Sequence, residues 1–460
     1  MHRSVIILFL ALCCCFFAQA QRSKDIVHKV RWMENIYTIS KKYNANPNAI
    51  LEYNQISANE IRRGIILRIP IDIQETTNQN LDSLNRLDPN NSIIPENLYL
   101  SDCMEHRPSS WTTHRASMIL PFHLQDARPN SNYLDFYQGV LMAVWDLKEE
   151  GMSIELTSYD LESFPHIPAW VQSGALKNEE LVIGPVSAND LFEVLNYTYG
   201  QNIKVISPLD SQTESAADTN PNFFQVNTPL YWQQYNLIQH LRKYSGTVWL
   251  FCEESGADQE LVNVIKDILS KNHIIYKEFI HKVTKGVDIR GELSQMLTHR
   301  QNNQVIVAST NEAFVSDVLS NLYLVQTRND CPVTLYGNAR WRNFDVDLEY
   351  YHNMNLHLST TNYIDYQDPI VKRFIERYRS LYRTEPTPYA YQGYDVGFYF
   401  LNALYTKGFH FEYCVEQGAI PARPLQSVFQ FQKVSPDGGF INIGSRVIRY
   451  LPDFRIEILH

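Results

Sequence analysis

The residues able to act as acids, bases or nucleophiles are scattered along this sequence and form no reactive motif. Histidines such as His123 and His166 stand alone, and a lone histidine is more often a surface or loop residue than a ligand. The acidic pairs Glu149-Glu150 and Glu253-Glu254 are typical of solvated helix or loop ends. No G-x-G-x-x-G, Walker, G-x-S-x-G or H-E-x-x-H motif is present. We therefore expect no catalytic residues, no metal site, no cofactor and no enzymatic activity.

Cysteine chemistry is also limited. Three of the 7 cysteines stand in the apolar N-terminal run, and the others are Cys103, Cys252, Cys331 and Cys414. These four are too widely spaced for a disulfide-rich scaffold or a Cys-pair zinc site. One structural disulfide is compatible with an exported protein, but the spacing does not indicate which two cysteines would pair.

The N-terminus predicts export. Residues 5–17 are apolar after a short basic start, and Ala18-Gln19-Ala20 forms a small-x-small cleavage pattern, so residues 1–20 are expected to be a signal peptide cleaved before Gln21. An uncleaved anchor is the alternative, but the run is shorter than the roughly 20 residues that span a bilayer. A lipoprotein signal is a further alternative, although Leu12 stands before Cys13 where a small residue is usual. We expect a soluble periplasmic protein of a Gram-negative cell.

Composition favours a folded, non-nucleic-acid-binding protein. The formal net charge is −10 and the sequence pI is about 5.8. A nucleic-acid-binding protein normally presents a basic face, and no block dense in lysine and arginine occurs. The 44% hydrophobic fraction is ordinary for a globular protein, and the length suggests two or three folding units.

Residues 26–71 predict a small β-α-α-β module. A strand precedes a helix that Asn35 can cap, Pro47 begins a second helix, and Gly64 leads into a closing strand. The segment resembles LysM domains in the following residues: His28, Val30, Glu34, Ile36, Ile39, Tyr43, Asn54, Gly64, Leu67, Ile69 and Pro70. It departs from the LysM pattern at Met33, where glycine is usual, and at Asn35, where threonine is usual.

The LysM resemblance implies binding to peptidoglycan through its N-acetylglucosamine-containing glycans. Carried over by position, the groove has one wall made of Met33, Glu34, Asn35 and Ile36, and another made of Gln55, Ile56 and Ser57. Amide and backbone hydrogen bonds with apolar contacts suit a neutral acetamido sugar. Plain capping and loop chemistry is the alternative for each residue.

The remaining chain predicts a linker at 72–115 and an α/β domain at 116–460. Near-continuous apolar strands alternate with amphipathic helices, and the rhythm restarts after Pro229. Two such runs imply two lobes, each with a doubly wound parallel sheet. We expect lobe 1 at 116–229 and 356–405, and lobe 2 at 230–355 and 406–460.

This large domain resembles type I periplasmic binding proteins, the fold of branched-chain amino-acid receptors. The similarity lies in residues 118–122 with the helix that follows, in 182–188, 205–211 and 223–229, and above all in 369–404 with its Gly393-Tyr394-Asp395 motif. The resemblance implies a ligand cleft between the lobes. Carried over by position, its residues are Ser187, Ala188, Leu209, Asp210 and Ser211. Asp210 replaces a small neutral residue and Gln225 replaces a common arginine, so both departures disfavour an anionic ligand group.

Two functions fit this sequence. The first is a substrate-binding protein held at the cell wall, whose two-lobed domain binds a small solute such as an amino acid or a wall fragment. The second is a non-enzymatic scaffold or regulator of peptidoglycan synthesis, in which the same domain contacts a cell-wall synthesis protein. An enclosed polar pocket would favour the first function, and a collapsed cleft would favour the second.

Overall fold

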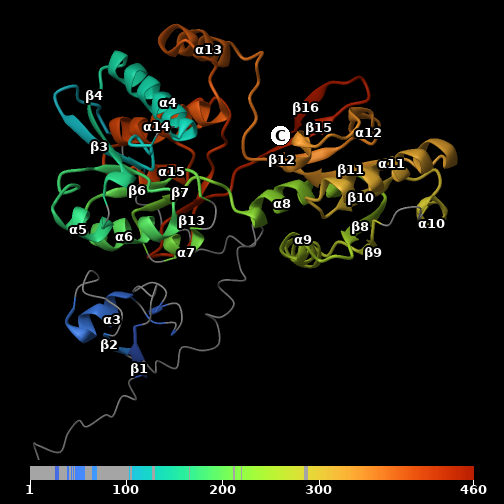
Figure 1. The fold of residues 1–460 in the computed structure, drawn as a ribbon, viewed down its shortest axis with the longest axis horizontal. Coiled ribbons are helices and arrows are strands. Elements are labelled where there is room, and N and C mark those ends of the chain that lie inside the picture. The colour runs from blue at the N-terminus through green and yellow to red at the C-terminus, as the bar shows by residue number, and fades with distance from the viewer. Residues whose placement is uncertain are drawn as a thin grey trace, which may run out of the picture. The chain divides into compact units, whose positions relative to one another are not determined.

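The computed structural model of this chain describes residues 26–30, 39–40, 43, 45, 47–56, 65–69, 103, 106–126, 130–164, 166–210, 213–218, 220–283 and 288–459. The chain divides into two compact units, Met1–Tyr99 and Leu100–His460 (Figure 1). The predicted signal peptide and most of the predicted linker lie outside the described residues. Within the described part, no helix is long and apolar enough to cross a membrane.

The first unit contains two short strands and a helix in the predicted order. Strand β1 (Ile26–Lys29) pairs antiparallel with β2 (Ile66–Ile69), and α3 (Pro47–Asn54) lies between them in sequence. The backbone is also helical at Ile39, Ser40 and Tyr43. Its described core is small and apolar, with the following buried residues: Val30, Ile39, Ile50, Leu51, Leu67 and Ile69.

Asn54 joins the end of α3 to β2. Its Nδ2 donates to the carbonyl oxygens of Ile50 and Arg68, both at 2.7 Å, and its Oδ1 accepts from the Arg68 N–H at 2.7 Å. Gln55 follows in the left-handed region with φ 52°, and the Ile56 N–H bonds the Leu51 carbonyl at 3.1 Å. This is the hydrogen-bond pattern of a Schellman helix end, so the residues at 54–56 fix the path of the chain out of the helix.

The second unit contains two seven-stranded sheets, each the centre of a lobe. The strands of lobe 1, in spatial order, are β13 (Phe431–Lys433), β14 (Phe440–Asn442), β7 (Phe223–Gln225), β6 (Lys204–Ser207), β5 (Leu181–Ile183), β3 (Thr113–Leu120) and β4 (Ser153–Asp160). Its helices are α4 (Ser131–Glu149), η2 (Leu161–Ser163), α5 (Ile167–Gln172), α6 (Ala188–Thr198), α7 (Glu214–Ala217), α13 (Pro369–Tyr382), α14 (Pro388–Lys407) and α15 (Glu412–Val415). Every strand pair in this sheet is parallel except β13 with β14.

Lobe 2 repeats the arrangement. Its strands, in spatial order, are β16 (Ile456–Leu459), β15 (Arg446–Tyr450), β12 (His357–Thr360), β11 (Val333–Asn338), β10 (Asn303–Val307), β8 (Thr247–Glu253) and β9 (Tyr276–His281). Its helices are α8 (Leu230–Gln239), η3 (His240–Lys243), α9 (Gln259–Lys271), α10 (Arg290–Met296), α11 (Glu312–Asn329), η4 (Ala339–Asn343) and α12 (Leu348–Asn353). Only the pairs made by β15 are antiparallel.

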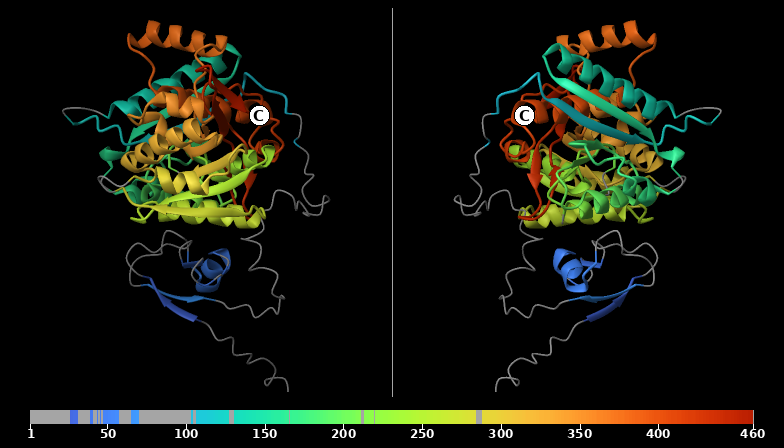
Figure 2. Two further views of the ribbon diagram at one scale, coloured as in Figure 1. Left: turned by 90° about the vertical axis from the view of Figure 1, so that its right-hand side faces the viewer. Right: turned by 90° about the vertical axis from the view of Figure 1, so that its left-hand side faces the viewer.

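Each sheet is covered by helices on both faces (Figure 2). In lobe 2, Val248 and Leu250 belong to the core shared with α8 and α9, whereas Trp249 and Phe251 belong to the core shared with α10 and α11. This alternation is the period of two that places successive strand residues on opposite faces. The predicted α/β architecture with two mostly parallel sheets is confirmed.

The lobe boundaries differ from the predicted ones. The chain crosses between the lobes three times, from β7 to α8, from β12 to α13 and from β14 to β15. Residues 357–360 therefore belong to the lobe 2 sheet instead of lobe 1, and β13 and β14 extend the lobe 1 sheet instead of lobe 2. The predicted linker also ends too late, because β3 already begins at Thr113. Strands β12, β13 and β14 are short, and only their pairing with strands distant in sequence decides which sheet they join.

Helices α4 and α14 approach closely in lobe 1 because glycines lie at their contact. A Cβ atom at Gly139 would overlap the Ala390 carbonyl oxygen, and one at Gly393 would overlap the Phe136 carbonyl oxygen. Glycine therefore permits backbone-to-backbone packing that any larger residue would prevent. The Gly393 of the Gly393-Tyr394-Asp395 motif has this packing role.

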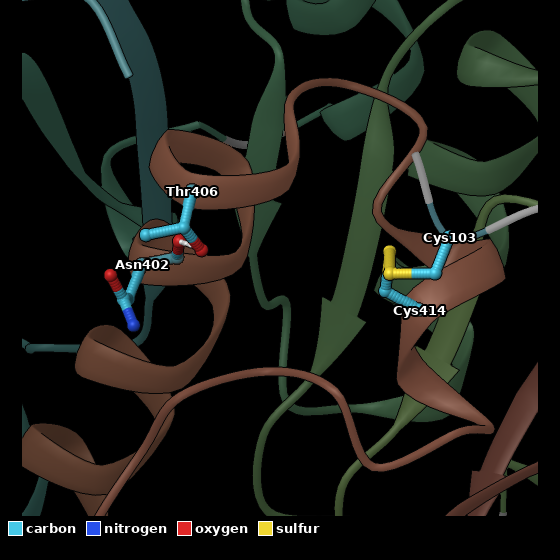
Figure 3. The surroundings of a disulfide bond; sticks show 4 residues. All are labelled: Cys103, Asn402, Thr406 and Cys414. Atoms are coloured by element: carbon cyan, nitrogen blue, oxygen red, sulfur yellow. Dashed lines mark hydrogen bonds between the residues drawn. A yellow bond between two sulfur atoms is a disulfide. The ribbon is translucent and has the colours of Figure 1, made fainter. Parts of the chain in front are cut away.

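A disulfide bond attaches the chain before β3 to helix α15 of lobe 1. Cys103 pairs with Cys414 of α15, and their Cα atoms lie 4.7 Å apart (Figure 3). The pairing that the sequence left open is thus Cys103 with Cys414, while Cys252 and Cys331 are buried and unpaired. Cys103 lies within the part of the chain predicted as linker, so this end of the linker is bound to the large unit.

Candidate ligand site between the lobes

The parallel strands of both lobes direct their carboxyl ends toward the region where the lobes meet, and a pocket of about 320 Å³ lies there. We call it the interlobe pocket. Lobe 1 contributes Leu209 after β6 and Asn227 and Thr228 after β7. Lobe 2 contributes Thr361 and Asn362 after β12. A cleft at strand carboxyl ends is the usual ligand site of open α/β sheets.

Two helices complete the interlobe pocket. Pro388, Tyr389 and Gln392 lie in the first turns of α14, and Gln233 lies in the first turn of α8. Because α8 directly follows the first crossing between the lobes, residues from both lobes and from a crossing segment meet around one volume. Any molecule held in this pocket would contact both lobes.

Carboxamide side chains are fixed in the pocket wall by hydrogen bonds to the backbone and to one another. The Gln392 Nε2 donates to the Pro208 carbonyl at 3.1 Å and to Asn227 Oδ1 at 3.4 Å. The Gln233 Nε2 donates to the Thr228 carbonyl at 2.7 Å, and the Asn227 Nδ2 donates to the Leu209 carbonyl. These bonds orient the side chains without a ligand, which lowers the entropy lost on binding.

The crossing segments beside the pocket are bonded to each other. The Thr228 hydroxyl donates to the Gly444 carbonyl, and the Asn442 Nδ2 donates to the Val226 carbonyl at 2.9 Å. Thus the crossing after β7 is joined to the one before β15 by buried side-chain bonds.

The sequence-predicted cleft residues lie in different environments. Leu209 lines the interlobe pocket, whereas Asp210 is half-buried and is not among the lining residues. Ser187 is exposed and is the N-cap of α6, where its Oγ accepts from the Asp190 N–H at 3.3 Å, and Ala188 is the first residue of that helix. Ser211 lies outside the described residues. A ligand role for these five residues stays a prediction.

Gln225 is part of the core. It is fully buried, its Oε1 accepts from the Thr213 hydroxyl at 2.9 Å, and its Nε2 donates to the Asn227 carbonyl at 3.1 Å. Through that last bond it supports the backbone of a pocket residue. Gln225 is thus bonded inside lobe 1 and is not among the residues that line the interlobe pocket.

Sequence reasoning missed the carboxamides of the pocket. Asn227 lay within residues 223–229, which carried the family resemblance, and Gln392 directly precedes the Gly393-Tyr394-Asp395 motif. Asparagine and glutamine are common on surfaces, so their type alone gives no signal. Only their position directly after a strand or at the start of a helix could have identified them.

The predicted glycan residues of the first unit are mostly undescribed. Met33, Glu34, Asn35, Ile36 and Ser57 lie outside the described residues. Gln55 is exposed and Ile56 is half-buried, directly after α3. Both lie at the loop where the resemblance places one wall of the groove.

The carboxyl group of Asp395 is buried beside the second crossing. It accepts from the backbone N–H groups of Leu425, Gln426 and Ser427, at 2.6, 3.0 and 2.9 Å. Burial raises the pKa of this group, and the three donors oppose that change. Asp395 thus holds residues 425–427 against α14, so this motif residue has a structural role.

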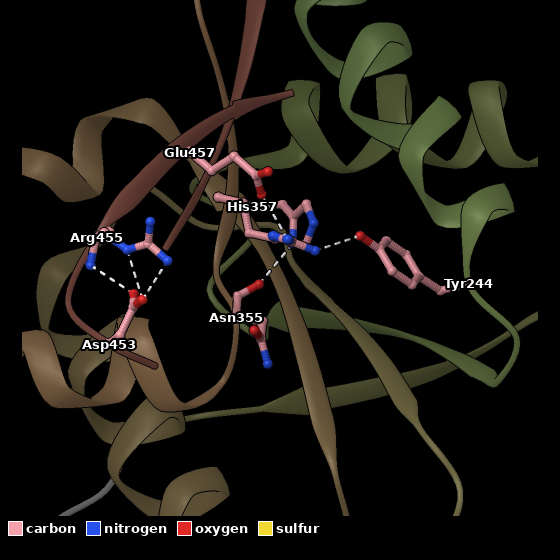
Figure 4. A network of polar contacts seen from close by, with 7 residues as sticks. Tyr244, Asn355, His357, Asp453, Arg455 and Glu457 are labelled. Atoms are coloured by element: carbon pink, nitrogen blue, oxygen red, sulfur yellow. Dashed lines mark hydrogen bonds and ion pairs between the residues drawn. The ribbon is translucent and has the colours of Figure 1, made fainter. Parts of the chain in front are cut away.

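A second polar cluster lies at the outer part of the lobe 2 sheet (Figure 4). Arg449 donates to the Tyr244 hydroxyl at 2.9 Å and to Glu457 Oε2 at 2.6 Å. His357 is 1% exposed, donates through Nδ1 to the Asn355 carbonyl at 2.7 Å, and stacks on a buried tyrosine. Burial lowers the pKa of His357 to about 4, so the imidazole is neutral at pH 7. Within the described part of the chain, no three His, Cys, Asp or Glu residues are placed to hold a metal ion.

The large domain has the two-lobed fold of type I periplasmic binding proteins. Two solved structures show this similarity. A substrate-binding protein of an ABC transporter from Desulfitobacterium hafniense is 16% identical to this chain in sequence and superposes with a TM-score of 0.50. The match covers 76% of this chain and 100% of that protein. A putative branched-chain amino acid ABC transporter protein from Rhodospirillum rubrum is 12% identical with a TM-score of 0.56 and the same coverage of both chains. At these identities the likeness concerns the fold alone. No protein-family model matches the sequence, and no curated protein is significantly similar to it.

Proposed function

We propose that this chain is an exported, non-enzymatic binding protein whose large domain holds a small solute in the interlobe pocket. The observation behind the proposal is that residues from both lobes and from the first crossing line one polar volume at the carboxyl ends of the strands. The fold supports it, since the Desulfitobacterium hafniense protein with this fold is a substrate-binding protein of an ABC transporter. A solute that contacts both lobes would stabilise one relative arrangement of them.

Solute binding is tested by a thermal-unfolding screen of the full mature chain against amino acids, short peptides, sugars and muropeptides. A ligand at 100 times its Kd stabilises the native state by about 2.7 kcal/mol, which is readily measured. Any hit should be lost in Tyr389→Ala and kept in Tyr413→Ala, a matched change at an exposed tyrosine. If no compound raises the midpoint, the domain does not act as a receptor, and the scaffold function gains support.

The first unit is proposed to bind peptidoglycan glycans as a LysM-type module. Its support is the pattern of residues at 26–71 together with the described strands, helix and chain exit at Asn54, Gln55 and Ile56. The test is co-sedimentation of the full chain with purified sacculi. Ile56→Asp should reduce the bound fraction, whereas Ile66→Asp, on an exposed position of β2, should not. If Ile56→Asp, or a chain lacking residues 26–71, binds sacculi as well as the parent protein does, this role is excluded.

Export to the periplasm is proposed from the residues at 1–20, and the Cys103–Cys414 disulfide supports an oxidising compartment. N-terminal sequencing of the native protein should find Gln21 as the first residue. An intact Met1 in the purified protein would contradict signal cleavage.

A further inference from the structure

The interlobe pocket has no ionisable group other than a tyrosine hydroxyl among the described residues that line it. Its polar groups are the carboxamides of Asn227, Gln233, Asn362 and Gln392 and the hydroxyls of two threonines and Tyr389. A carboxamide supplies both a donor and an acceptor, and a hydroxyl does the same. The wall therefore matches a solute whose own groups both donate and accept.

Part of this hydrogen-bonding capacity is unused by the protein. The donors of Gln233 and Gln392 bond to the backbone, but their carbonyl oxygens have no partner among the described residues. In the same part of the chain, the Asn362 carboxamide only accepts, from the Thr360 hydroxyl through Oδ1 at 3.5 Å, and neither its Nδ2 nor the Tyr389 hydroxyl makes a hydrogen bond. These groups stand on three separate elements around one volume, so a bound solute can satisfy them together.

A charged solute fits this wall poorly. An ammonium or carboxylate group taken from water needs an opposite charge or several strong hydrogen bonds, and its desolvation is expensive without them. The adjacent Asp210 is not among the lining residues and has interactions of its own. An amino acid carries both charges, and the described wall offers a counter-charge to neither.

From this wall we infer that the interlobe pocket binds an uncharged, hydroxyl-rich solute of about monosaccharide size, a neutral sugar, in preference to an amino acid. The inference rests on the proposed solute-binding function and specifies its ligand. Hydroxyl groups match the carboxamides, and the Tyr389 ring offers an apolar face for the C–H side of a sugar ring. A volume of about 320 Å³ lies at the small end of ligand pockets, which suits one ring and not a long oligomer.

The test uses isothermal titration of the full mature chain at pH 6 with D-glucose, N-acetyl-D-glucosamine, D-glucosamine and L-leucine. The first two are neutral, glucosamine carries an ammonium on the same ring, and leucine is a zwitterion. We expect at least one neutral sugar to bind at least 10-fold more tightly than glucosamine and leucine. If leucine binds more tightly than both neutral sugars, the inference is overturned while the proposed function stays intact. Binding of none of the four would overturn the inference, and the wider solute screen would then decide the proposed function.

A charge placed in the pocket sharpens the test. Asn362→Asp is nearly isosteric and should lower the affinity for the neutral sugar. It should raise the affinity for glucosamine at least 10-fold, because it adds a counter-charge for the ammonium. Asn263→Asp, at an exposed position of α9, is the matched control and should change neither affinity. Near-UV circular dichroism checks that both variants are folded. An unchanged preference in a folded Asn362→Asp would show that the solute does not occupy this pocket and would overturn the inference.

Discussion

Replacing Asp395 with asparagine should destabilise the large domain although the two side chains have nearly the same shape. Asp395 is 1% exposed, and its two oxygens accept from three backbone N–H groups of residues 425–427. Asparagine keeps only one accepting oxygen and presents an amide N–H₂ group at the other position. In the best orientation its oxygen retains the Gln426 and Ser427 donors, which share Oδ2, and its N–H₂ group then faces the Leu425 N–H.

The magnitude follows from these bonds. A buried N–H group left without an acceptor costs about 1–3 kcal/mol, and two bonds to a charged acceptor weaken by about 1 kcal/mol in total when the acceptor becomes neutral. Removing a buried charge offsets part of this loss because its desolvation is relieved. These losses amount to about 2–4 kcal/mol before the offset, so we expect the free energy of unfolding to fall by about 2 kcal/mol.

Urea unfolding followed by circular dichroism measures this change, with Asp345→Asn as the control. Asp345 is exposed, and its substitution should stay within about 0.5 kcal/mol of the parent. If Asp395→Asn is as stable as the control, the three hydrogen bonds do not hold residues 425–427 and the structural role assigned to the motif is wrong.

Three further predictions concern the stability of the large domain. Changing Cys103 and Cys414 to serine should lower the free energy of unfolding by about 2–5 kcal/mol, measured in urea, and a loss below about 1 kcal/mol would contradict an ordered disulfide. The pKa of His357 is about 4 in the folded state against about 6.5 in the unfolded state, so its burial in the neutral form contributes about 3 kcal/mol of stability at pH 7. This contribution is lost as the pH falls from about 6.5 to 4. His357→Asn should therefore flatten the pH dependence of the unfolding midpoint, and an unchanged profile would refute this. Gly393→Ala should destabilise by about 1–3 kcal/mol or more because its methyl group overlaps the backbone of α4, while Gly291→Ala in α10 meets open space and should be neutral or stabilising in the same assay.

The sequence predicted the class of fold because the spacing of hydrophobic residues within a short segment indicates a helix or a strand without knowledge of the rest of the chain. Continuous apolar runs such as residues 118–120 and 181–183 indicated buried parallel strands, and the structure places them next to each other in one sheet. The lobe boundaries were not predictable in the same way. Strands β14 and β7 pair across more than 200 residues of sequence, and a three-residue apolar run fits either sheet equally well until the crossings are known.

The candidate site shows the same division between local and long-range information. Leu209 could be predicted because it lies two residues after the end of a strand. In contrast, Asn227, Asn362 and Gln392 become neighbours only when the three crossings bring their elements together. Ser187 shows the opposite difficulty. A serine after a strand and before a helix suits both a ligand hydroxyl and an N-cap, and the observed bond to the Asp190 N–H accounts for the cap alone.

The motif that carried the family resemblance therefore reports fold and not ligand. Gly393 allows α4 and α14 to touch, and Asp395 fixes the segment that follows residue 424, so both residues would be required whatever the solute. Gln392, one position earlier, faces no such packing demand and lines the pocket. Ligand preference must then depend on pocket residues that the motif leaves free to vary. The chain thus has the fold of type I periplasmic binding proteins, and we infer that its wall of carboxamides and hydroxyls is what would favour a neutral sugar.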